Sequence, residues 1–168
     1  MSARAQRGRA RCISVIGSGL CEESSESWRL AEQVGGLLGE AGVTVFCGGR
    51  GGVMEAVARG ASGAGGTVIA ILPGTDPGEA NRHCTHAVAT GVGRARNLAI
   101  VASGEATIAI GGEWGTLAEI AFARNISRPV VALGSWAVSG AGDMEGGPGV
   151  LAATSAEQAV ALALGPPA

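Results

Sequence analysis

Short apolar runs alternate along the chain with longer segments that have helical spacing. The apolar runs are nearly continuous, as in residues 12–16 and 67–72, and do not alternate with polar residues. Such strands are typical of a parallel sheet that is covered on both faces. Between the runs, apolar residues recur one turn apart, for example Leu30, Val34 and Leu38. The pattern therefore predicts an α/β protein.

The same pattern gives approximate limits for each element. We expect strands at 12–16, 43–47, 67–72, 87–90, 106–110 and 129–133, and helices at 28–40, 53–61, 94–103, 116–125 and 155–164. In the third of these helices, Leu98 and Val101 should face the core. Residues 73–86 and 139–149 are rich in turn-forming residues and should be loops. The expected fold is three-layer and Rossmann-like, with a mostly parallel sheet and helices on both faces.

Length and the N-terminal composition set the domain organisation. A chain of 168 residues fits one nucleotide- or cofactor-binding domain, here 12–168, preceded by a flexible basic tail at 1–11. The tail lacks the apolar core of a signal peptide, and no apolar run is long enough to cross a membrane. We therefore expect a cytoplasmic protein without a membrane partner.

Charge and residue types exclude several kinds of chemistry. The formal net charge is −2, so nucleic acid is not an expected partner. All twelve basic residues are Arg, and without Lys the chain can form neither a P-loop lysine contact nor a pyridoxal-phosphate Schiff base. No two of the four cysteines are spaced as a C-x-x-C motif, and we expect their thiols to be reduced and partly buried. His83 and His86 should lie at the surface, and no metal ligand set is visible. The cysteines are Cys12, Cys21, Cys47 and Cys84.

Three glycine-rich turns, at 17–19, 48–52 and 111–115, each follow a predicted strand. In a parallel sheet these turns meet at one edge, where ligands bind. The third turn leads into a helix, whose free N–H groups and positive dipole end favour a phosphate. A phosphate-bearing small molecule is therefore the expected ligand. The residues expected to bind it are Gly17, Ser18, Gly19, Gly48, Gly49, Arg50, Gly51, Gly52, Arg94, Arg96, Asn97, Gly111, Gly112, Glu113, Trp114, Gly115 and Thr116.

Several of these side chains have two interpretations. The spacing of Thr116 and Glu119 fits a capping box, in which Glu119 only stabilises the helix start. Alternatively, Glu119 faces the ligand as a general base or as a stabiliser of positive charge. Trp114 either stacks on a ligand ring or packs against the protein, and Arg50 either clamps a phosphate or faces water.

Arg94 and Arg96 stand at a predicted strand-to-helix turn, beside two glycines. Anions bind at such turns, so we expect at least one of these arginines to contact phosphate. Asn97 is a polar side chain next to them.

Four segments together resemble the molybdenum cofactor carrier protein-like family: GGRGGVMEAVARGA, ILPGTD, GRARN and GGEWGTLAEIAFA. That family belongs to a superfamily that also contains the LONELY GUY (LOG) phosphoribohydrolases and DprA-related proteins. The similarity covers roughly residues 12–165. It implies a Rossmann-like fold, a homo-oligomer (dimer or tetramer), and a phosphate-bearing ligand at the glycine turns.

The LOG enzymes carry the pattern P-G-G-x-G-T-x-x-E. Here Glu119 matches their catalytic Glu and Arg96 their catalytic Arg, but Gly111 replaces the Pro and Glu113 the second Gly. In the pattern G-G-G-x-x-G-L-M-G, Cys47 replaces the first Gly, and Glu55 replaces the last. The resemblance thus favours a carrier of molybdenum cofactor or of a nucleoside monophosphate. An N-glycosidic hydrolase of nucleoside 5′-monophosphates is the alternative, and DNA binding is a weaker one.

Overall fold

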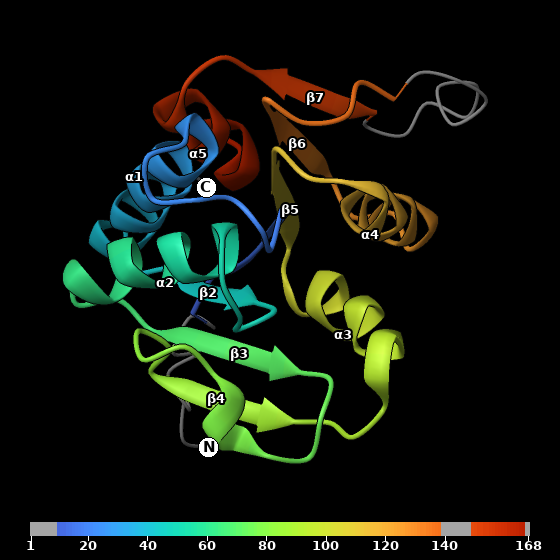
Figure 1. Ribbon diagram of the computed structural model, residues 1–168. Coiled ribbons are helices and arrows are strands. Elements are labelled where there is room, and N and C mark those ends of the chain that lie inside the picture. The colour runs from blue at the N-terminus through green and yellow to red at the C-terminus, as the bar shows by residue number, and fades with distance from the viewer. Residues whose placement is uncertain (1–9, 139–148, 167–168) are drawn as a thin grey trace, which may run out of the picture.

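The computed structural model describes residues 10–138 and 149–166, and its strands form a seven-stranded parallel sheet with helices on both faces (Figure 1). The order across the sheet is β4-β3-β2-β1-β5-β6-β7. This confirms the Rossmann-like α/β class expected from the continuous apolar runs. The strands are β1 (Cys12–Gly17), β2 (Thr44–Cys47), β3 (Val68–Leu72), β4 (His86–Ala89), β5 (Ala106–Ile110), β6 (Val130–Leu133) and β7 (Val150–Ala153).

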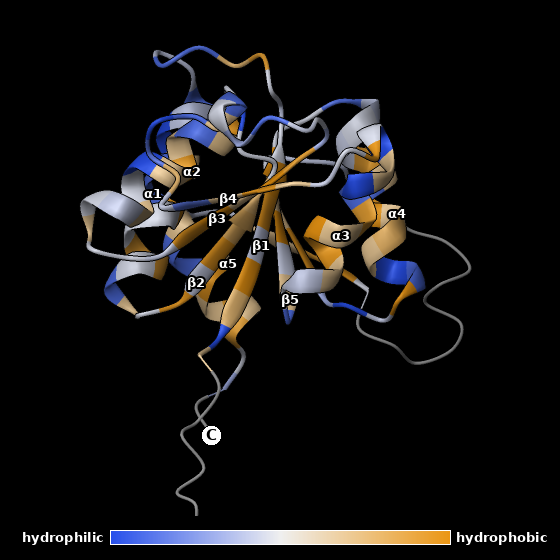
Figure 2. Cartoon of the chain, turned by 90° about the horizontal axis from the view of Figure 1, so that it is seen from below, coloured by the Kyte–Doolittle hydropathy of each residue, from blue (hydrophilic) through white to orange (hydrophobic). Residues whose placement is uncertain are grey.

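Helices cover the sheet unevenly. α1, α2 and α5 lie on one face, and α3 and α4 lie on the other, as Figures 1 and 2 show. Each face buries its own apolar cluster against the strands, which are mostly hydrophobic in Figure 2. The helices are α1 (Glu26–Glu40), α2 (Val53–Gly63), α3 (Arg96–Ser103), α4 (Trp114–Asn125) and α5 (Ala156–Leu164), with short 3₁₀ turns η1 (Pro77–Glu79) and η2 (Gly93–Ala95).

Two helices begin at serine caps, which explains where they start. The side chain of Ser25 accepts a hydrogen bond from the Trp28 amide at the start of α1, and Ser155 accepts one from the Gln158 amide at the start of α5. Each cap satisfies an amide that has no partner within its helix. α5 therefore starts within one residue of the expected limit, whereas α1 starts two residues before it.

Glycines allow α1 and α2 to pack backbone to backbone. A Cβ placed on Gly35 of α1 would collide with the Val57 carbonyl oxygen, and one on Gly60 of α2 would collide with the Glu32 carbonyl oxygen. Only residues without a side chain permit this approach. The close packing fixes α2, and with it the turn that precedes it, against the rest of the sheet.

The chain reverses its direction of travel across the sheet between β1 and β5. From β1 it builds outward through β2, β3 and β4, and it then returns to place β5 on the other side of β1. The connections after β1 and β5 consequently diverge and leave a crevice at the carboxyl ends of these strands. In doubly wound folds this topological switch point is where ligands bind.

The structure corrects some of the expected limits. α4 begins at Trp114, two residues before the predicted start, and α3 begins at Arg96 after the η2 turn. Strand β7 was not predicted, because it has only four residues and ends in two alanines, which have a low strand propensity. Val101 is buried as expected, but Leu98 is 42% exposed. Residues 1–9 of the predicted tail and 139–148 of the predicted loop lie outside the described residues.

In the described ranges, each helix is too short or too polar to cross a bilayer.

Candidate functional site

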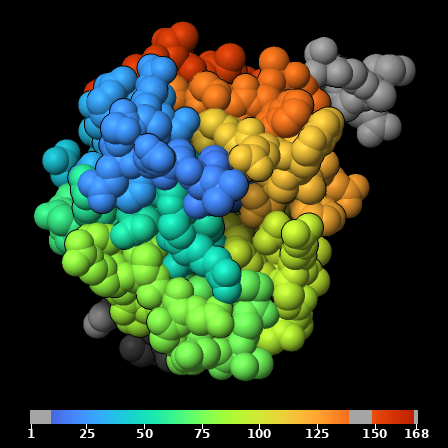
Figure 3. Space-filling view, in the orientation of Figure 1, coloured from blue at the N-terminus to red at the C-terminus, as the bar shows by residue number. Residues whose placement is uncertain are grey.

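A cleft of about 180 Å³ lies at the switch point between β1 and β5. Figure 3 shows the surface hollowed where the segment that follows β1 meets the segments that begin α3 and α4. Segments far apart in the sequence therefore build one site. The lining residues are Gly17, Ser18, Gly19, Met54, Arg96, Asn97, Glu113, Gly115, Thr116 and Glu119.

The start of α4 gives the cleft its main-chain donors. Glu113 occupies the N-cap position without making a side-chain cap hydrogen bond, and Gly115 and Thr116 of the first helical turn line the cleft. The turn before the helix needs glycine: φ is +55° at Gly111 and +100° at Gly112. First-turn amides without a cap and the positive end of the helix dipole favour an anion at this point.

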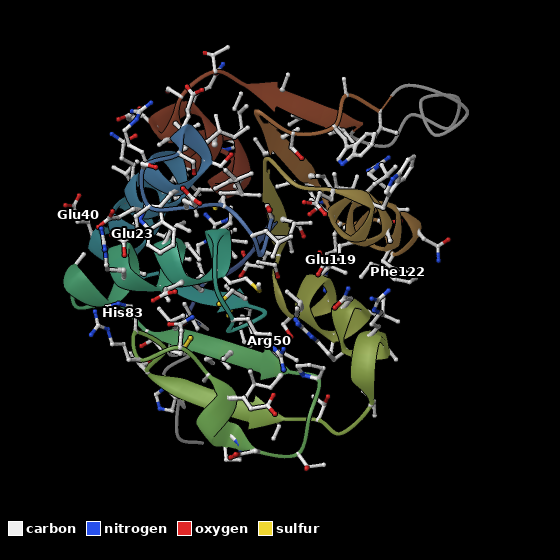
Figure 4. The ribbon with its side chains drawn as sticks, viewed as in Figure 1. Glu23, Glu40, Arg50, His83, Glu119 and Phe122 are labelled. Atoms are coloured by element: carbon white, nitrogen blue, oxygen red, sulfur yellow. The ribbon has the colours of Figure 1, made fainter. Side chains whose placement is uncertain are left out.

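Glu119 lies in the second turn of α4 and is only 8% exposed. Because Glu113 is the cap residue, Glu119 is not at the third helical position, so the capping-box interpretation is wrong. Figure 4 shows Glu119 between α4 and α3, with Arg50 across from it near the end of β3. Burial raises the pKa of Glu119 from 4.5 to about 7, although the charge of Arg96 opposes this rise. Glu119 is thus a buried carboxyl poised to exchange a proton near neutral pH.

Arg96 is the first residue of α3, and its side chain is buried in the cleft wall. Its Nε has no hydrogen-bond partner among the described residues. A Cβ on Gly48 would collide with the Arg96 guanidinium and lie 2.5 Å from the Met54 sulfur, so a larger residue at this position would displace the ends of both side chains. Burial lowers the pKa of Arg96, and the nearby carboxylate of Glu119 only partly offsets this lowering. A buried guanidinium with an unsatisfied N–H is a ready partner for an anionic ligand.

The second glycine turn supports the cleft from below. The Val53 amide donates to the Ser18 carbonyl over 2.9 Å, so the first amide of α2 holds the turn after β1. A Cβ on Gly52 would collide with the same Ser18 carbonyl. Arg50 instead forms an ion pair with Glu79 at 2.6 Å. Among the described residues that line the cleft, none comes from 48–52, so the ligand contacts predicted there stay predictions.

Other predicted residues surround the cleft without lining it. Arg94 is exposed on η2, two residues before the cleft-lining pair Arg96 and Asn97. Trp114 is 76% exposed and packs on Trp136, with 5.2 Å between ring centroids and a 39° tilt. The Trp136 indole N–H donates to the Glu113 carbonyl over 3.2 Å, which anchors this aromatic pair beside the cleft.

Two further placements concern residues outside the predicted set. Met54, in the first turn of α2, lines the cleft although nothing in its side chain suggested it; its position directly after the glycine turn was the available signal. His86 is exposed and His83 is partly buried, and Figure 4 shows His83 far from Glu119. Within residues 10–138 and 149–166, no three His, Cys, Asp or Glu residues group as a metal site.

Known proteins share both the sequence and the architecture. An uncharacterized protein of Archaeoglobus fulgidus is 46% identical over 121 residues, covering 72% of this chain and 78% of that one. The molybdenum cofactor binding protein of Rippkaea orientalis superposes with a TM-score of 0.81 at 32% identity, over 90% of this chain and 94% of that one. The molybdenum cofactor carrier protein of Chlamydomonas reinhardtii gives 0.77 at 30% identity, with coverages of 90% and 94%.

These likenesses agree with the resemblance carried by the glycine turns and by the segment around Glu119. The two solved structures each cover 90% of this chain. The sequence profile of the SLOG cluster4 family matches residues 10–160. The chain belongs to the SLOG cluster4 family, with the Rossmann-like fold of ligand-binding relatives.

Proposed function

We propose that this protein binds and carries a small phosphate-bearing molecule of the molybdenum cofactor type in the cleft between β1 and β5. The observation that carries the proposal is the convergence of two anion-binding elements. One is the uncapped start of α4, and the other is the buried Arg96 guanidinium with its unpartnered Nε. A phosphate placed between them would satisfy both.

The exposed tryptophan pair supports a ligand that also contains a ring. Trp114 lies between the cleft-lining residues Glu113 and Gly115, so its indole stands at the rim. A large aromatic surface that is left exposed beside a polar cleft suits a pterin or a purine. Phosphate in the cleft and a ring on Trp114 would together bind both ends of such a molecule.

The donor set also fits a ligand that brings its own metal. The cleft offers amides, a guanidinium and a carboxyl, and the described residues include no cluster of metal ligands. A cofactor that arrives with its metal already bound would need no metal ligand from the protein. The cleft residues would therefore recognise the phosphate, and Trp114 would recognise the ring.

The test is binding by calorimetry, with molybdenum cofactor released anaerobically from a purified molybdoenzyme as the probe. Arg96→Met should weaken its binding roughly 10- to 100-fold, because a charge-assisted hydrogen bond contributes about 1.5–3 kcal/mol. Arg29→Met, on the exposed surface of α1, is the matched control and should bind like wild type. Equal affinity of the Arg96 variant would contradict the proposal.

A second function is favoured by the buried carboxyl of Glu119. A nucleoside 5′-monophosphate in this cleft would place its phosphate at the start of α4. Ionised Glu119 would then stabilise the positive charge that develops on the ribose carbon and would orient water. The products are the free base and ribose 5-phosphate. Even with a pKa of about 7, a large share of Glu119 is ionised at neutral pH.

This alternative is tested by incubating the protein with AMP and with an isoprenylated AMP and assaying ribose 5-phosphate. If the protein is a hydrolase, Glu119→Gln should lose most turnover. Glu105→Gln, which lies directly before β5 at the end of the strand away from the cleft, should keep it. Tight cofactor binding without turnover would leave the carrier function and eliminate the hydrolase. For DNA binding, the formal net charge of −2 counts against a polyanionic ligand.

We also propose that the chain is a cytoplasmic homo-oligomer. Exposed apolar side chains on α3 and α4, namely Leu98, Phe122 and Ile126, support a contact between copies through this face. The four free cysteines fit a reducing compartment.

A further inference from the structure

Two cysteines that are distant in the sequence lie against the same part of the core. Cys47 ends β2 and is fully buried, and its thiol donates to the Met54 carbonyl over 3.8 Å. Cys84 belongs to the loop before β4 and packs, half-buried, against the apolar cluster that contains Cys47. One thiol is therefore sealed inside the protein, and the other reaches toward the surface.

Backbone hydrogen bonds hold the loop of Cys84 over β2 and β3. On one side, the Asn81 amide donates to the Gly49 carbonyl over 2.8 Å, and its side chain donates to the Arg50 carbonyl over 2.9 Å. On the other side, the Thr85 amide donates to the Val68 carbonyl over 3.0 Å. Cys84 thus lies between two bonded residues of its loop. Their partners, Gly49 and Val68, lie on either side of the level of Cys47 in the sheet.

Cys47 pairs across the sheet with Ala70, which is two positions after Val68 in β3. In its own strand, Cys47 lies directly before the turn that contains Gly49. The Thr85 hydroxyl adds a second bond to Val68, donating to its carbonyl over 2.9 Å. The loop is therefore bonded to residues close to Cys47 in both strands, and Cys84 packs against the cluster that contains Cys47.

The two thiols also influence each other chemically. The Cys47 thiol and the Asn81 side chain lower the pKa of Cys84, against the opposing effects of burial and of the nearby Glu55. Contact with Cys84 and burial raise the pKa of Cys47 well above its usual value. Because Cys84 is also the more exposed of the two, it is the thiol that ionises and meets an oxidant more readily, and Cys47 is its neutral partner.

We propose that Cys84 and Cys47 are a site of reversible thiol oxidation, in which a hydroperoxide converts the pair into a disulfide. The Cys84 thiolate attacks the peroxide and becomes a sulfenic acid, releasing hydroxide or alkoxide. The Cys47 thiol then displaces hydroxide from that sulfur, and the proton it loses forms water. In total two thiols lose two electrons and two protons, and the hydroperoxide is reduced to water and an alcohol or a second water.

The bond would join the second glycine turn to the loop that faces it. Cys47 immediately precedes Gly48, which lies beneath the Arg96 guanidinium. Oxidation would therefore fix the floor of the cleft. The inference depends only on the two thiols, so it stands whether or not the cleft binds a phosphate.

The experiment uses the full chain with Cys12 and Cys21 replaced by serine, which leaves only the proposed pair. One equivalent of hydrogen peroxide should lower the intact mass by 2 Da and remove both titratable thiols. Non-reducing peptide mapping should show one fragment that joins residues 47 and 84. Dithiothreitol should restore the mass and the thiols.

Single variants test the order of the two steps. With Cys47→Ala in the same background, Cys84 should react with dimedone, a trap for sulfenic acid. With Cys84→Ser, Cys47 should give no adduct at the same peroxide dose. A gain of 16 or 32 Da in the two-cysteine protein, without the loss of 2 Da, would overturn the proposal, and so would an unchanged mass. The wild-type chain, mapped in parallel, keeps the test valid if a variant folds poorly.

Discussion

At the scale of single residues, the site depends on two charged side chains held away from water. Neither Glu119 nor Arg96 is exposed by more than a tenth, and each influences the pKa of the other. Buried ionisable groups are costly unless they are used or well paired. Their presence at the switch point, rather than in either apolar cluster, is what separates this cleft from ordinary surface hollows.

The raised pKa of Glu119 predicts a specific dependence of stability on pH. Because its pKa rises from 4.5 unfolded to about 7 folded, the folded protein binds the extra proton between these values. Its stability should therefore fall as pH rises through this range. Glu119→Gln lacks this titration. The difference between its free energy of unfolding and that of wild type should therefore rise by about 3 kcal/mol from pH 4 to pH 8.5. Urea unfolding across that range measures the difference, and parallel profiles for the two proteins would contradict the burial argument.

At the scale of elements, the packing of α1 on α2 positions the second glycine turn. Two glycines of α2 provide a matched pair of substitutions. Gly60→Ala should destabilise the protein by roughly 1–3 kcal/mol, because its Cβ would collide with the Glu32 carbonyl of α1. Gly63→Ala has open space around it and should stabilise the protein by roughly 0.5–1 kcal/mol through helix propensity. Thermal denaturation compares the two variants, and the same sign for both would argue against the close backbone approach.

The elements also show what sequence patterns can and cannot predict. Strands β1, β3, β5 and β6 were predictable because their residues are mostly apolar and buried, and β2 and β4 were predicted although fewer of their residues are buried. β7 was missed because its four residues end in two alanines, which have a low strand propensity. The start of α4 was misplaced because Thr116 and Glu119 imitate a capping box, while Glu113 holds the cap. Local spacing identified each glycine turn, but only the sheet order brings Arg96 beside Glu119.

At the scale of the whole molecule, the two faces of the sheet differ in how much apolar surface they leave uncovered. The α3 and α4 face exposes Leu98 and Phe122, whereas α5 on the other face exposes Leu162. We expect Leu98→Glu combined with Phe122→Glu to shift the chain to monomers in light scattering, since charges would be buried in the contact. Leu162→Glu should leave the oligomer intact. An unchanged mass for the double variant would place the contact elsewhere.

The tilted pair of Trp114 and Trp136 provides an optical signal as well as a surface. Three tryptophans are present in the chain, and the third, Trp28, is buried in α1. Emission at long wavelength should therefore come largely from the exposed Trp114 ring. A molecule that settles over this indole should quench that emission or shift it to the blue. The protein thus carries its own fluorophore, and occupancy can be followed in a cuvette without any added label.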